Sequence, residues 1–166
     1  MSIAAMNTIR VFTVGGTIDK IYFDAKSSYE VGPPNIGEIL EGLRLNPFFK
    51  ITSLMQKDSL DMTEEDRMVI FDAVSATSEK RIIITHGTDT MVETAKRLSG
   101  IENKTIVLTG ALEPARFRTS DAMFNIGAAV TAVQILPPGV FVVMNGEVFN
   151  HDKVRKDVEL GRFVPL

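Results

Sequence analysis

The sequence predicts an α/β fold in which a mostly parallel sheet carries helices on both faces, a three-layer α/β/α architecture of the Rossmann-like or flavodoxin-like kind. Two observations predict it. Short apolar runs rich in β-branched residues alternate with stretches of helical period, which is the order typical of parallel sheets. The runs are also apolar almost throughout, as expected of strands buried on both faces. At 166 residues the chain is the size of one domain, and no linker or repeat divides residues 1–166.

Five of these apolar runs are predicted to form the strands. They are residues 9–14, 51–55, 81–85, 104–109 and 140–144. The first run stops at Gly15-Gly16, a pair that favours a tight turn. Because the carboxyl ends of parallel strands meet at one edge of a sheet, the residues that follow these runs should gather there.

Four helices are predicted between the strands. They are expected at residues 36–43 with Asn35 as cap, after the capping box Thr63-Glu64-Glu65-Asp66, from Asp89 to Gly100, and from Ser120-Asp121 to about Ile135. Each shows apolar residues at helical spacing or a recognisable start signal.

Residues 18–32 do not fit this alternation. They mix charged, small and aromatic residues without a clear period and include Lys26-Ser27-Ser28-Tyr29. A long polar excursion directly after a glycine turn is typical of a loop that closes over a site. We therefore expect a mobile lid here.

Composition excludes several classes of function. The formal net charge is -3 and no run of lysines or arginines occurs, so a nucleic-acid surface is not expected. No apolar run approaches the ~20 residues of a membrane span. The chain has no cysteine, which excludes disulfides and thiolate chemistry. Residues 1–7 lack the features of a signal peptide, so a cytoplasmic location is expected.

The residues that follow the predicted strands are rich in hydroxyls and carboxylates. They include Thr17, Ser59, Thr88, Asp89 and, further along, Lys156. Only two histidines occur in the chain, without the spacing of a metal site, so we expect no metal. A threonine hydroxyl attacks a carbonyl only when another group removes its proton, and a desolvated lysine can act as that base. The pattern favours acyl transfer, although both glycine turns could equally be plain strand exits or helix caps.

Two of these segments resemble a known family. Thr13-Val14-Gly15-Gly16-Thr17-Ile18 and Ile84-Thr85-His86-Gly87-Thr88-Asp89-Thr90 are similar to the two signature segments of bacterial-type L-asparaginases and glutaminase-asparaginases. Similarity extends along almost the whole chain, through the lid-like segment 26–32, the segments 58–62 and 110–114, and the stretch leading to Lys156.

The resemblance implies roles for individual residues. Thr17 with Tyr29 would form one hydroxyl-centred group, and Thr88, Asp89 and Lys156 the other. Substrate binding would fall to Gly16, Ser59, Gly87, Thr88, Asp89 and Ala111, with Asp89 on the substrate ammonium, Ser59 on its carboxylate and the Ala111 carbonyl near its amide. No cofactor is implied.

Two departures from the family pattern stand out. Leu60 occupies a position where many members have a polar residue that helps to bind substrate. Members also continue into a smaller C-terminal domain that completes the active site of the neighbouring protomer, and residues 1–166 correspond to the first domain only. We therefore expect impaired substrate binding by this chain alone.

The expected function is that of an asparaginase-type amidohydrolase, dimeric in the manner of its relatives, which releases ammonia from L-asparagine or a related small amide through a threonine nucleophile. One alternative is a non-catalytic small-ligand binding or interaction domain that retains the site. The other is the amidase part of a tRNA-dependent amidotransferase, against which the lack of a basic patch argues.

Overall fold

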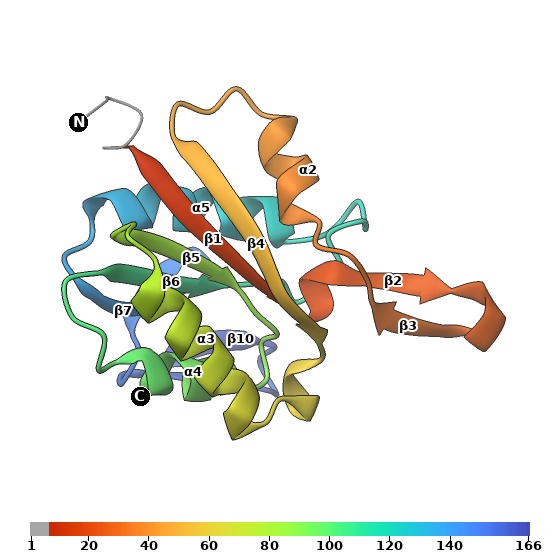
Figure 1. The fold of residues 1–166 in the computed structure, drawn as a ribbon. Helices are drawn as coiled ribbons and strands as arrows, with labels where there is room; N and C mark the ends of the chain where they lie inside the picture. The colour runs from red at the N-terminus through yellow and green to blue at the C-terminus, as the bar shows by residue number, and fades with distance from the viewer. Residues whose placement is uncertain (1–6) are drawn as a thin grey trace.

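A computed structural model describes residues 7–166 as a central sheet between two layers of helices (Figure 1). The six strands of the sheet run in the order β4-β1-β5-β6-β7-β8. Their bounds are β1 Thr8–Gly15, β4 Phe48–Lys57, β5 Arg81–Thr85, β6 Thr105–Thr109, β7 Gly139–Met144 and β8 Glu147–Asn150. All neighbouring pairs are parallel except β7 with β8. The predicted fold class, a mostly parallel α/β sheet, is confirmed.

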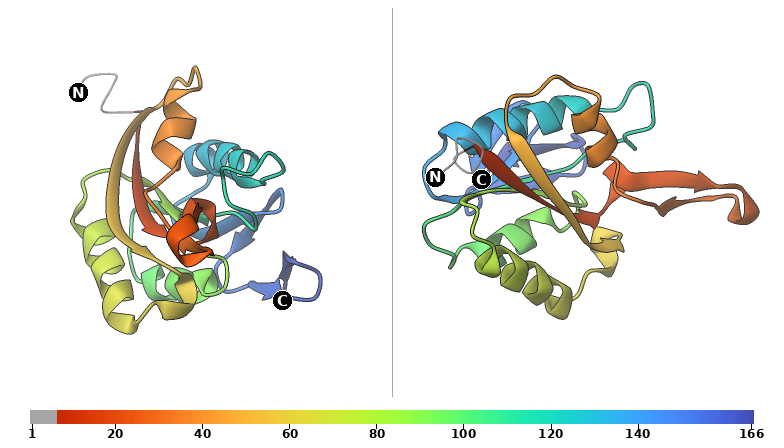
Figure 2. Two further views of the ribbon diagram at one scale, coloured as in Figure 1. Left: turned by 90° about the vertical axis from the view of Figure 1, so that its right-hand side faces the viewer. Right: turned by 45° about the horizontal axis from the view of Figure 1, so that its top comes forward.

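Helices cover both faces of the sheet (Figure 2). Their bounds are α2 Ile36–Glu41, α3 Glu64–Ala76, α4 Met91–Leu98 and α5 Ala122–Ile135. One buried cluster joins α3 and α4 to the sheet through Ile70 and Leu98. A second cluster on the opposite face joins α2 and α5 through Leu40 and Ala129. None of the helices in the described part of the chain is long and apolar enough to cross a membrane.

The order of the parallel strands determines where a ligand can bind. In chain order the five parallel strands lie second, first, third, fourth, fifth, so the direction of winding reverses between β1 and β5. Loops that leave the carboxyl ends of two such strands turn to opposite faces and open a crevice between them. The turn at Gly15-Gly16-Thr17 leaves β1 and the turn at His86-Gly87-Thr88 leaves β5, so both signature segments lie at this reversal.

The expectation that every predicted strand is buried on both faces is wrong for β4. This strand is at the edge of the sheet and pairs only with β1 within residues 7–166. Phe48 and Ile51 are 56% and 39% exposed. An apolar run predicts a strand, but its place in the sheet depends on contacts made far along the chain.

Residues 18–32 are regular structure and not an irregular loop, which corrects the expectation from the sequence. A short 3-10 helix, η1 (Thr17–Asp19), leads into the hairpin of β2 (Lys20–Phe23) and β3 (Ser28–Val31). The turn between them contains η2 (Asp24–Lys26) and Ser27 in the left-handed conformation, φ 50°. The hairpin projects from the body of the molecule (Figures 1 and 2). That it acts as a lid stays a prediction.

The capping signals had mixed outcomes. Thr63 and Asp66 form the predicted capping box at the start of α3. Asn35 precedes α2 but its side chain makes no capping hydrogen bond; its amide nitrogen donates to the carbonyl of Ile18 (3.3 Å) and to Oδ1 of Asp19 (3.4 Å). Asn35 therefore joins two segments instead of capping its helix.

The last part of the chain forms an antiparallel pair that the sequence did not predict. Strands β9 (Val154–Asp157) and β10 (Arg162–Pro165) pair with one another. Asn145, in a left-handed turn at φ 55° after β7, accepts a hydrogen bond from the amide of Phe163 at 2.8 Å. Phe163 is buried in the same cluster as α3 and α4. These contacts anchor the pair that carries Lys156.

Candidate functional site

The two glycine turns touch one another. A Cβ added to Gly16 would lie 2.4 Å from both Cα and N of Gly87, far inside van der Waals contact. Gly16 also has φ 93° and ψ -176°, a conformation essentially restricted to glycine. Its amide donates to the carbonyl of Lys57 at 2.9 Å. The absence of side chains at these two positions therefore brings Thr17 and Thr88, the next residue on each turn, to neighbouring places.

Thr88, Asp89 and Lys156 form a hydrogen-bonded cluster. Nζ of Lys156 donates to Oγ1 of Thr88 at 2.8 Å and to Oδ1 of Asp89 at 2.6 Å. Thr88 is 5% exposed, whereas the side chains of Lys156 and Asp89 are 19% and 41% exposed. The structure thus brings Lys156 to two adjacent residues that lie 68 and 67 positions earlier in the chain. One face of the cluster reaches solvent.

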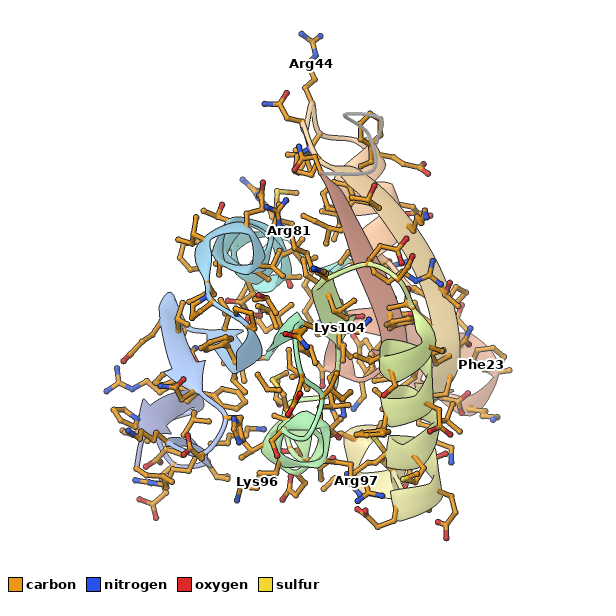
Figure 3. All side chains as sticks on the ribbon, turned by 60° about the vertical axis from the view of Figure 1, so that its left-hand side comes forward. Phe23, Arg44, Arg81, Lys96, Arg97 and Lys104 are labelled. Atoms are coloured by element: carbon orange, nitrogen blue, oxygen red, sulfur yellow. The ribbon has the colours of Figure 1, made fainter. Side chains whose placement is uncertain are left out.

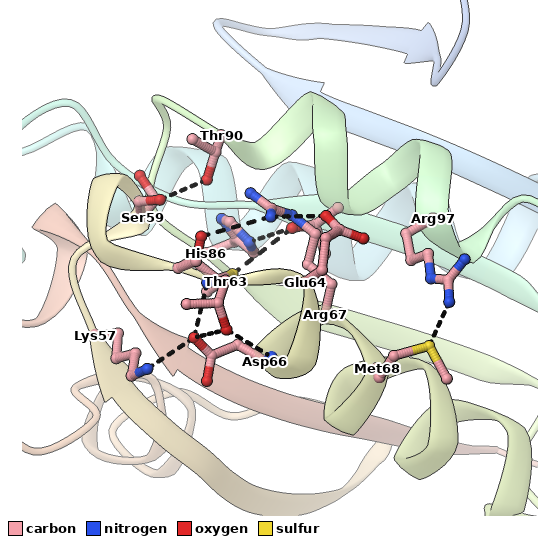
Figure 4. Close-up of polar contacts among 12 residues, drawn as sticks. Lys57, Ser59, Thr63, Glu64, Asp66, Arg67, Met68, His86, Thr90 and Arg97 are labelled. Carbon is pink, nitrogen blue, oxygen red and sulfur yellow. Dashed lines mark hydrogen bonds and ion pairs between the residues drawn. The ribbon is translucent and has the colours of Figure 1, made fainter.

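Ser59 lies beside the turn after β5. It begins the 3-10 helix η3 (Ser59–Asp61) and is 1% exposed. A Cβ on Gly87 would lie 2.6 Å from Oγ of Ser59, so Gly87 is what admits Ser59 to this position. Oγ1 of Thr90 donates to the carbonyl of Ser59 at 2.7 Å (Figure 4). The predicted carboxylate-binding serine is therefore held directly against the second signature segment.

Asp58 and Lys20 form an ion pair that the sequence did not reveal. Nζ of Lys20, at the base of the hairpin, lies 2.8 Å from Oδ2 of Asp58. Burial by itself would raise the pKa of Asp58, but the hydrogen bonds from Lys20 and from the Leu60 amide, with the charges of Lys20 and Lys156, hold it below its ordinary value. Asp58 is therefore an anion bound between the hairpin and the Ser59 segment.

His86 is a structural residue in this arrangement. It is 0% exposed, and burial lowers its pKa to about 4 against the weaker effect of its hydrogen bond to Gly87. Nδ1 lies 2.7 Å from the Gly87 carbonyl and Nε2 lies 2.8 Å from Oγ1 of Thr94. Since a carbonyl only accepts, Nδ1 carries the proton and the hydroxyl donates to Nε2. A neutral imidazole with both nitrogens engaged holds the turn that presents Thr88.

A second network ties the Thr17 turn to its surroundings. Oδ1 of Asp19 accepts from the backbone amide of Asn35 at 2.8 Å, and Oδ1 of Asn35 accepts from Nε of Arg116 at 3.4 Å. The amide of Ala115 donates to the carbonyl of Ile18 at 3.0 Å. Asn35 thus connects η1, α2 and the loop after β6. Nothing in the local pattern of the sequence signals this, because the three segments are distant in the chain.

Tyr29 packs against aromatic side chains of the hairpin and of the loop after β6. It is 50% exposed and its ring packs edge-on against Tyr22 and Phe117, with centroids 5.3 and 5.7 Å away. Thr17 itself is partly buried at the start of η1. A cavity of about 500 Å³ borders the hairpin, with Tyr29, Lys20 and Asp58 in its lining. That Tyr29 acts together with Thr17 stays a prediction.

Ala111 lies just after the end of β6. Ala111 is 0% exposed and packs in the cluster beneath α5. The carbonyl of the preceding Gly110 accepts from Nδ2 of Asn125 at 2.9 Å, which fixes the strand exit.

Within residues 7–166, no three His, Cys, Asp or Glu side chains are grouped so that they could hold a metal ion.

Known proteins are similar to this chain in sequence and in fold. A probable periplasmic L-asparaginase from Haemophilus influenzae is 31% identical over 164 residues, and the aligned part covers 92% of this chain and 47% of the Haemophilus protein. A component of the glutamyl-tRNA(Gln) amidotransferase of Methanococcus maripaludis is 30% identical over 154 residues, covering 86% of this chain and 36% of its own. The structure of L-asparaginase I from Vibrio cholerae superposes with a TM-score of 0.82 at 26% identity, covering 96% of this chain and 51% of the other.

The chain thus spans about half the length, or less, of these relatives. The profile of the asparaginase N-terminal domain matches residues 8–159. With both signature segments at the reversal of the sheet and Lys156 bonded to Thr88 and Asp89, the chain belongs to the asparaginase family, of which it represents the N-terminal domain.

Proposed function

We propose that this chain carries the amide-hydrolysing site of an asparaginase-type amidohydrolase, which releases ammonia from L-asparagine or a related small amide without a cofactor. The observation that carries the proposal is the position of Lys156, whose Nζ bonds to both Thr88 and Asp89. A lysine amine in contact with a hydroxyl can exchange a proton with it, and the neighbouring carboxylate orients the amine. The cluster therefore has the groups that hydroxyl chemistry needs.

Thr17 is the proposed nucleophile. Its hydroxyl would attack the amide carbonyl, forming the C–O bond of an acyl-enzyme, and the C–N bond would break as a proton passes to the departing nitrogen to give ammonia. Water activated by the Thr88–Lys156 pair would then hydrolyse the ester to the acid. Thr17 is the first residue of a 3-10 helix, so its backbone N–H has no hydrogen-bond partner within that helix. This N–H is therefore able to donate to the oxyanion. The amide of Gly16 is already bonded to Lys57.

Substrate recognition would fall to groups at the same strand exits. Asp89 is the proposed partner of the substrate ammonium and Ser59 of its carboxylate. Leu60, which is 72% exposed, offers only a backbone amide, and that amide bonds to Oδ1 of Asp58 at 3.1 Å. Recognition of the amino-acid end therefore rests on fewer polar side chains than the family pattern provides.

Ammonia release tests the proposal. Purified wild-type chain should release ammonia from asparagine or glutamine, Thr17→Ala should abolish it, and Thr17→Ser should restore part of it. Thr119→Ala is the matched control, because Thr119 is exposed and its hydroxyl donates to Oε2 of Glu113. Circular dichroism should be unchanged in all three variants. Activity of Thr17→Ala within a few-fold of wild type would refute Thr17 as nucleophile.

Similarity to a component of a tRNA-dependent amidotransferase favours a second candidate, in which this site supplies the amidase step of such a reaction. The net charge of -3 argues against direct tRNA binding. A gel-shift with tRNA at low salt separates the two, since the amidotransferase function predicts a shifted complex. The third possibility, a binding domain that retains the site, predicts that aspartate binds in a calorimeter although no amide is hydrolysed.

Self-association and a cytoplasmic location are part of the same proposal. A homodimer would match the expectation drawn from the family resemblance. The periplasmic description belongs to the Haemophilus relative, and fractionation of cells that produce the full protein would test the location.

A further inference from the structure

The chain passes from one face of the sheet to the other around β6. Helix α4, which precedes this strand and carries Lys96 and Arg97, packs on one face, and α5, which follows it, packs on the opposite face (Figure 3). The connection from β6 to α5 consists of residues 110–121. Because it starts at the carboxyl end of β6, this loop after β6 begins at the same edge of the sheet as the two signature segments.

The loop after β6 contacts both signature segments. A Cβ added to Gly110 would lie 2.3 Å from the carbonyl oxygen of His86, in the second segment. Further along the loop, the amide of Ala115 donates to the carbonyl of Ile18 at 3.0 Å, in the first segment. The stretch from Gly110 to Ala115 therefore runs between the two parts of the proposed site, and its conformation determines which backbone groups face that site.

Two side chains at the start of α5 hold the backbone of this stretch. The amide of Leu112 donates to Oδ1 and to Oδ2 of Asp121, each at 3.0 Å, and the amide of Glu113 donates to Oδ1 at 3.1 Å. Nδ2 of Asn125, which is 1% exposed, donates to Oδ2 of Asp121 at 2.8 Å and to the carbonyl of Gly110 at 2.9 Å. The Asp121 carboxylate is therefore the centre of the hydrogen bonds that fix the loop to the helix.

The Asp121 carboxylate does not cap its own helix. Asp121 occupies the N-cap position of α5, where an aspartate ordinarily accepts a hydrogen bond from an amide of the first helical turn. Its side chain makes no capping hydrogen bond, and the amide of Ala122 donates to Oγ of Ser120 at 3.1 Å. Helix capping therefore does not account for this carboxylate, whereas its bonds to the loop do.

The bond from Leu112 to Asp121 sets the direction of the Ala111 carbonyl. The N–H of Leu112 and the C=O of Ala111 belong to one peptide group, which is planar. The peptide bonds of the described residues are trans, and in a trans peptide the N–H and the C=O point in opposite directions. A carboxylate that holds the N–H therefore directs the carbonyl oxygen away from Asp121. Its negative charge also polarises the peptide group, which makes the oxygen a better hydrogen-bond acceptor.

We propose that Asp121 is a positioning residue for the leaving group of the reaction, acting through the Ala111 carbonyl. This rests on the proposed function, with the Ala111 carbonyl near the substrate amide. As the C–N bond breaks, the nitrogen takes up a proton and becomes a stronger hydrogen-bond donor. A carbonyl fixed to accept from this nitrogen therefore stabilises the transition state more than the bound substrate. Asp121 thereby favours substrates whose leaving group carries N–H.

Comparison of an amide with an ester tests this role. Asparagine and the β-methyl ester of aspartate have the same acyl group, but the methoxy oxygen of the ester carries no hydrogen that could be donated to the Ala111 carbonyl. Aspartate formation gives kcat/KM for both substrates, which reports the step in which the leaving group departs. In Asp121→Ala the amide-to-ester ratio of kcat/KM should fall about tenfold or more, the effect of losing a hydrogen bond to a charged group.

Two further variants separate positioning from a general loss of structure. Asp121→Asn keeps the shape and one acceptor oxygen, so it should recover part of the amide-to-ester ratio. Asp72→Ala removes an exposed aspartate of α3 and should leave the ratio unchanged. Urea unfolding confirms that every variant is folded. A residue that only supported the fold would lower hydrolysis of the amide and of the ester equally.

Amide hydrogen exchange tests the geometry without catalysis. The N–H groups of Leu112 and Glu113 should exchange about tenfold faster in Asp121→Ala than in wild type, because each loses its hydrogen bond. The N–H of Ala115, which bonds to Ile18, should exchange at the wild-type rate. Unchanged exchange at Leu112, or equal losses on the amide and the ester, would overturn the proposal. A wild-type chain that hydrolyses neither substrate would instead refute the proposed function, and with it the role of Asp121 in the reaction, whatever the exchange at Leu112.

Discussion

Gly16 lies so close to Gly87 that neither residue has room for a side chain: a Cβ on Gly16 would stand 2.4 Å from the Gly87 backbone. This contact joins the exits of β1 and β5, and it determines how near Thr17 and Thr88 can be. The two signature segments are therefore one packed unit.

Gly16→Ala should destabilise the protein and abolish activity. Alanine would combine a strained backbone at φ 93° with overlap against Gly87, so we expect the free energy of unfolding to fall by about 3–5 kcal/mol. Gly100→Ala is the control, because a Cβ there meets nothing within 4 Å. Urea unfolding measures both. Equal stability of the two variants would mean that the turns separate easily.

Lys156→Met should remove catalysis while the fold remains. Methionine keeps most of the aliphatic stem but cannot donate to Thr88 or Asp89, and loss of a proton-transferring group typically lowers kcat about 10²- to 10⁴-fold. Lys153→Met, on an exposed residue nearby, should retain the wild-type rate. Steady-state ammonia release gives kcat and KM for each. A variant that changes only KM would make Lys156 a binding residue.

His86 should make the protein sensitive to acid. Burial lowers its folded-state pKa to about 4 from 6.5, so between these values the unfolded chain binds a proton that the folded chain does not. Its contribution to stability is full above pH 6.5 and declines as the pH falls to 4, by about 3 kcal/mol in all. The difference in unfolding free energy between wild type and His86→Gln should follow this decline.

Asp19 should change the stability of the protein with pH in the opposite sense to His86. It is 2% exposed, and burial raises its pKa from 3.8 to about 6 despite the hydrogen bonds from Asn35. Between these values the folded state binds the extra proton, so Asp19 lowers stability as the pH rises from 4 to 6. Asp19→Asn cannot ionise and should therefore gain about 3 kcal/mol relative to wild type over that interval. Chemical unfolding at pH 4.5, 5.5 and 7 measures the gain; a constant difference would show that Asp19 does not titrate there.

Local chemistry accounts for most of what the sequence predicted correctly. Apolar runs such as residues 81–85 coincide with β5, and the capping box at Thr63 starts α3. In these elements the side-chain period and a hydrogen bond three residues away decide the structure. The hairpin of β2 and β3 was missed because its stability comes from pairs across the strands, such as Tyr22 with Tyr29, and not from a regular alternation.

The sequence by itself determined the fold class, the glycine turns and the residues that follow each strand, because these depend on neighbours in the chain. Only the tertiary structure decided which of those residues meet. Lys156 reaches Thr88 because β9 and β10 are anchored by Asn145 and Phe163, and Asp58 forms an ion pair with Lys20 from the hairpin. Such contacts join segments whose separation in the chain carries no period or local signal, so packing alone can place them.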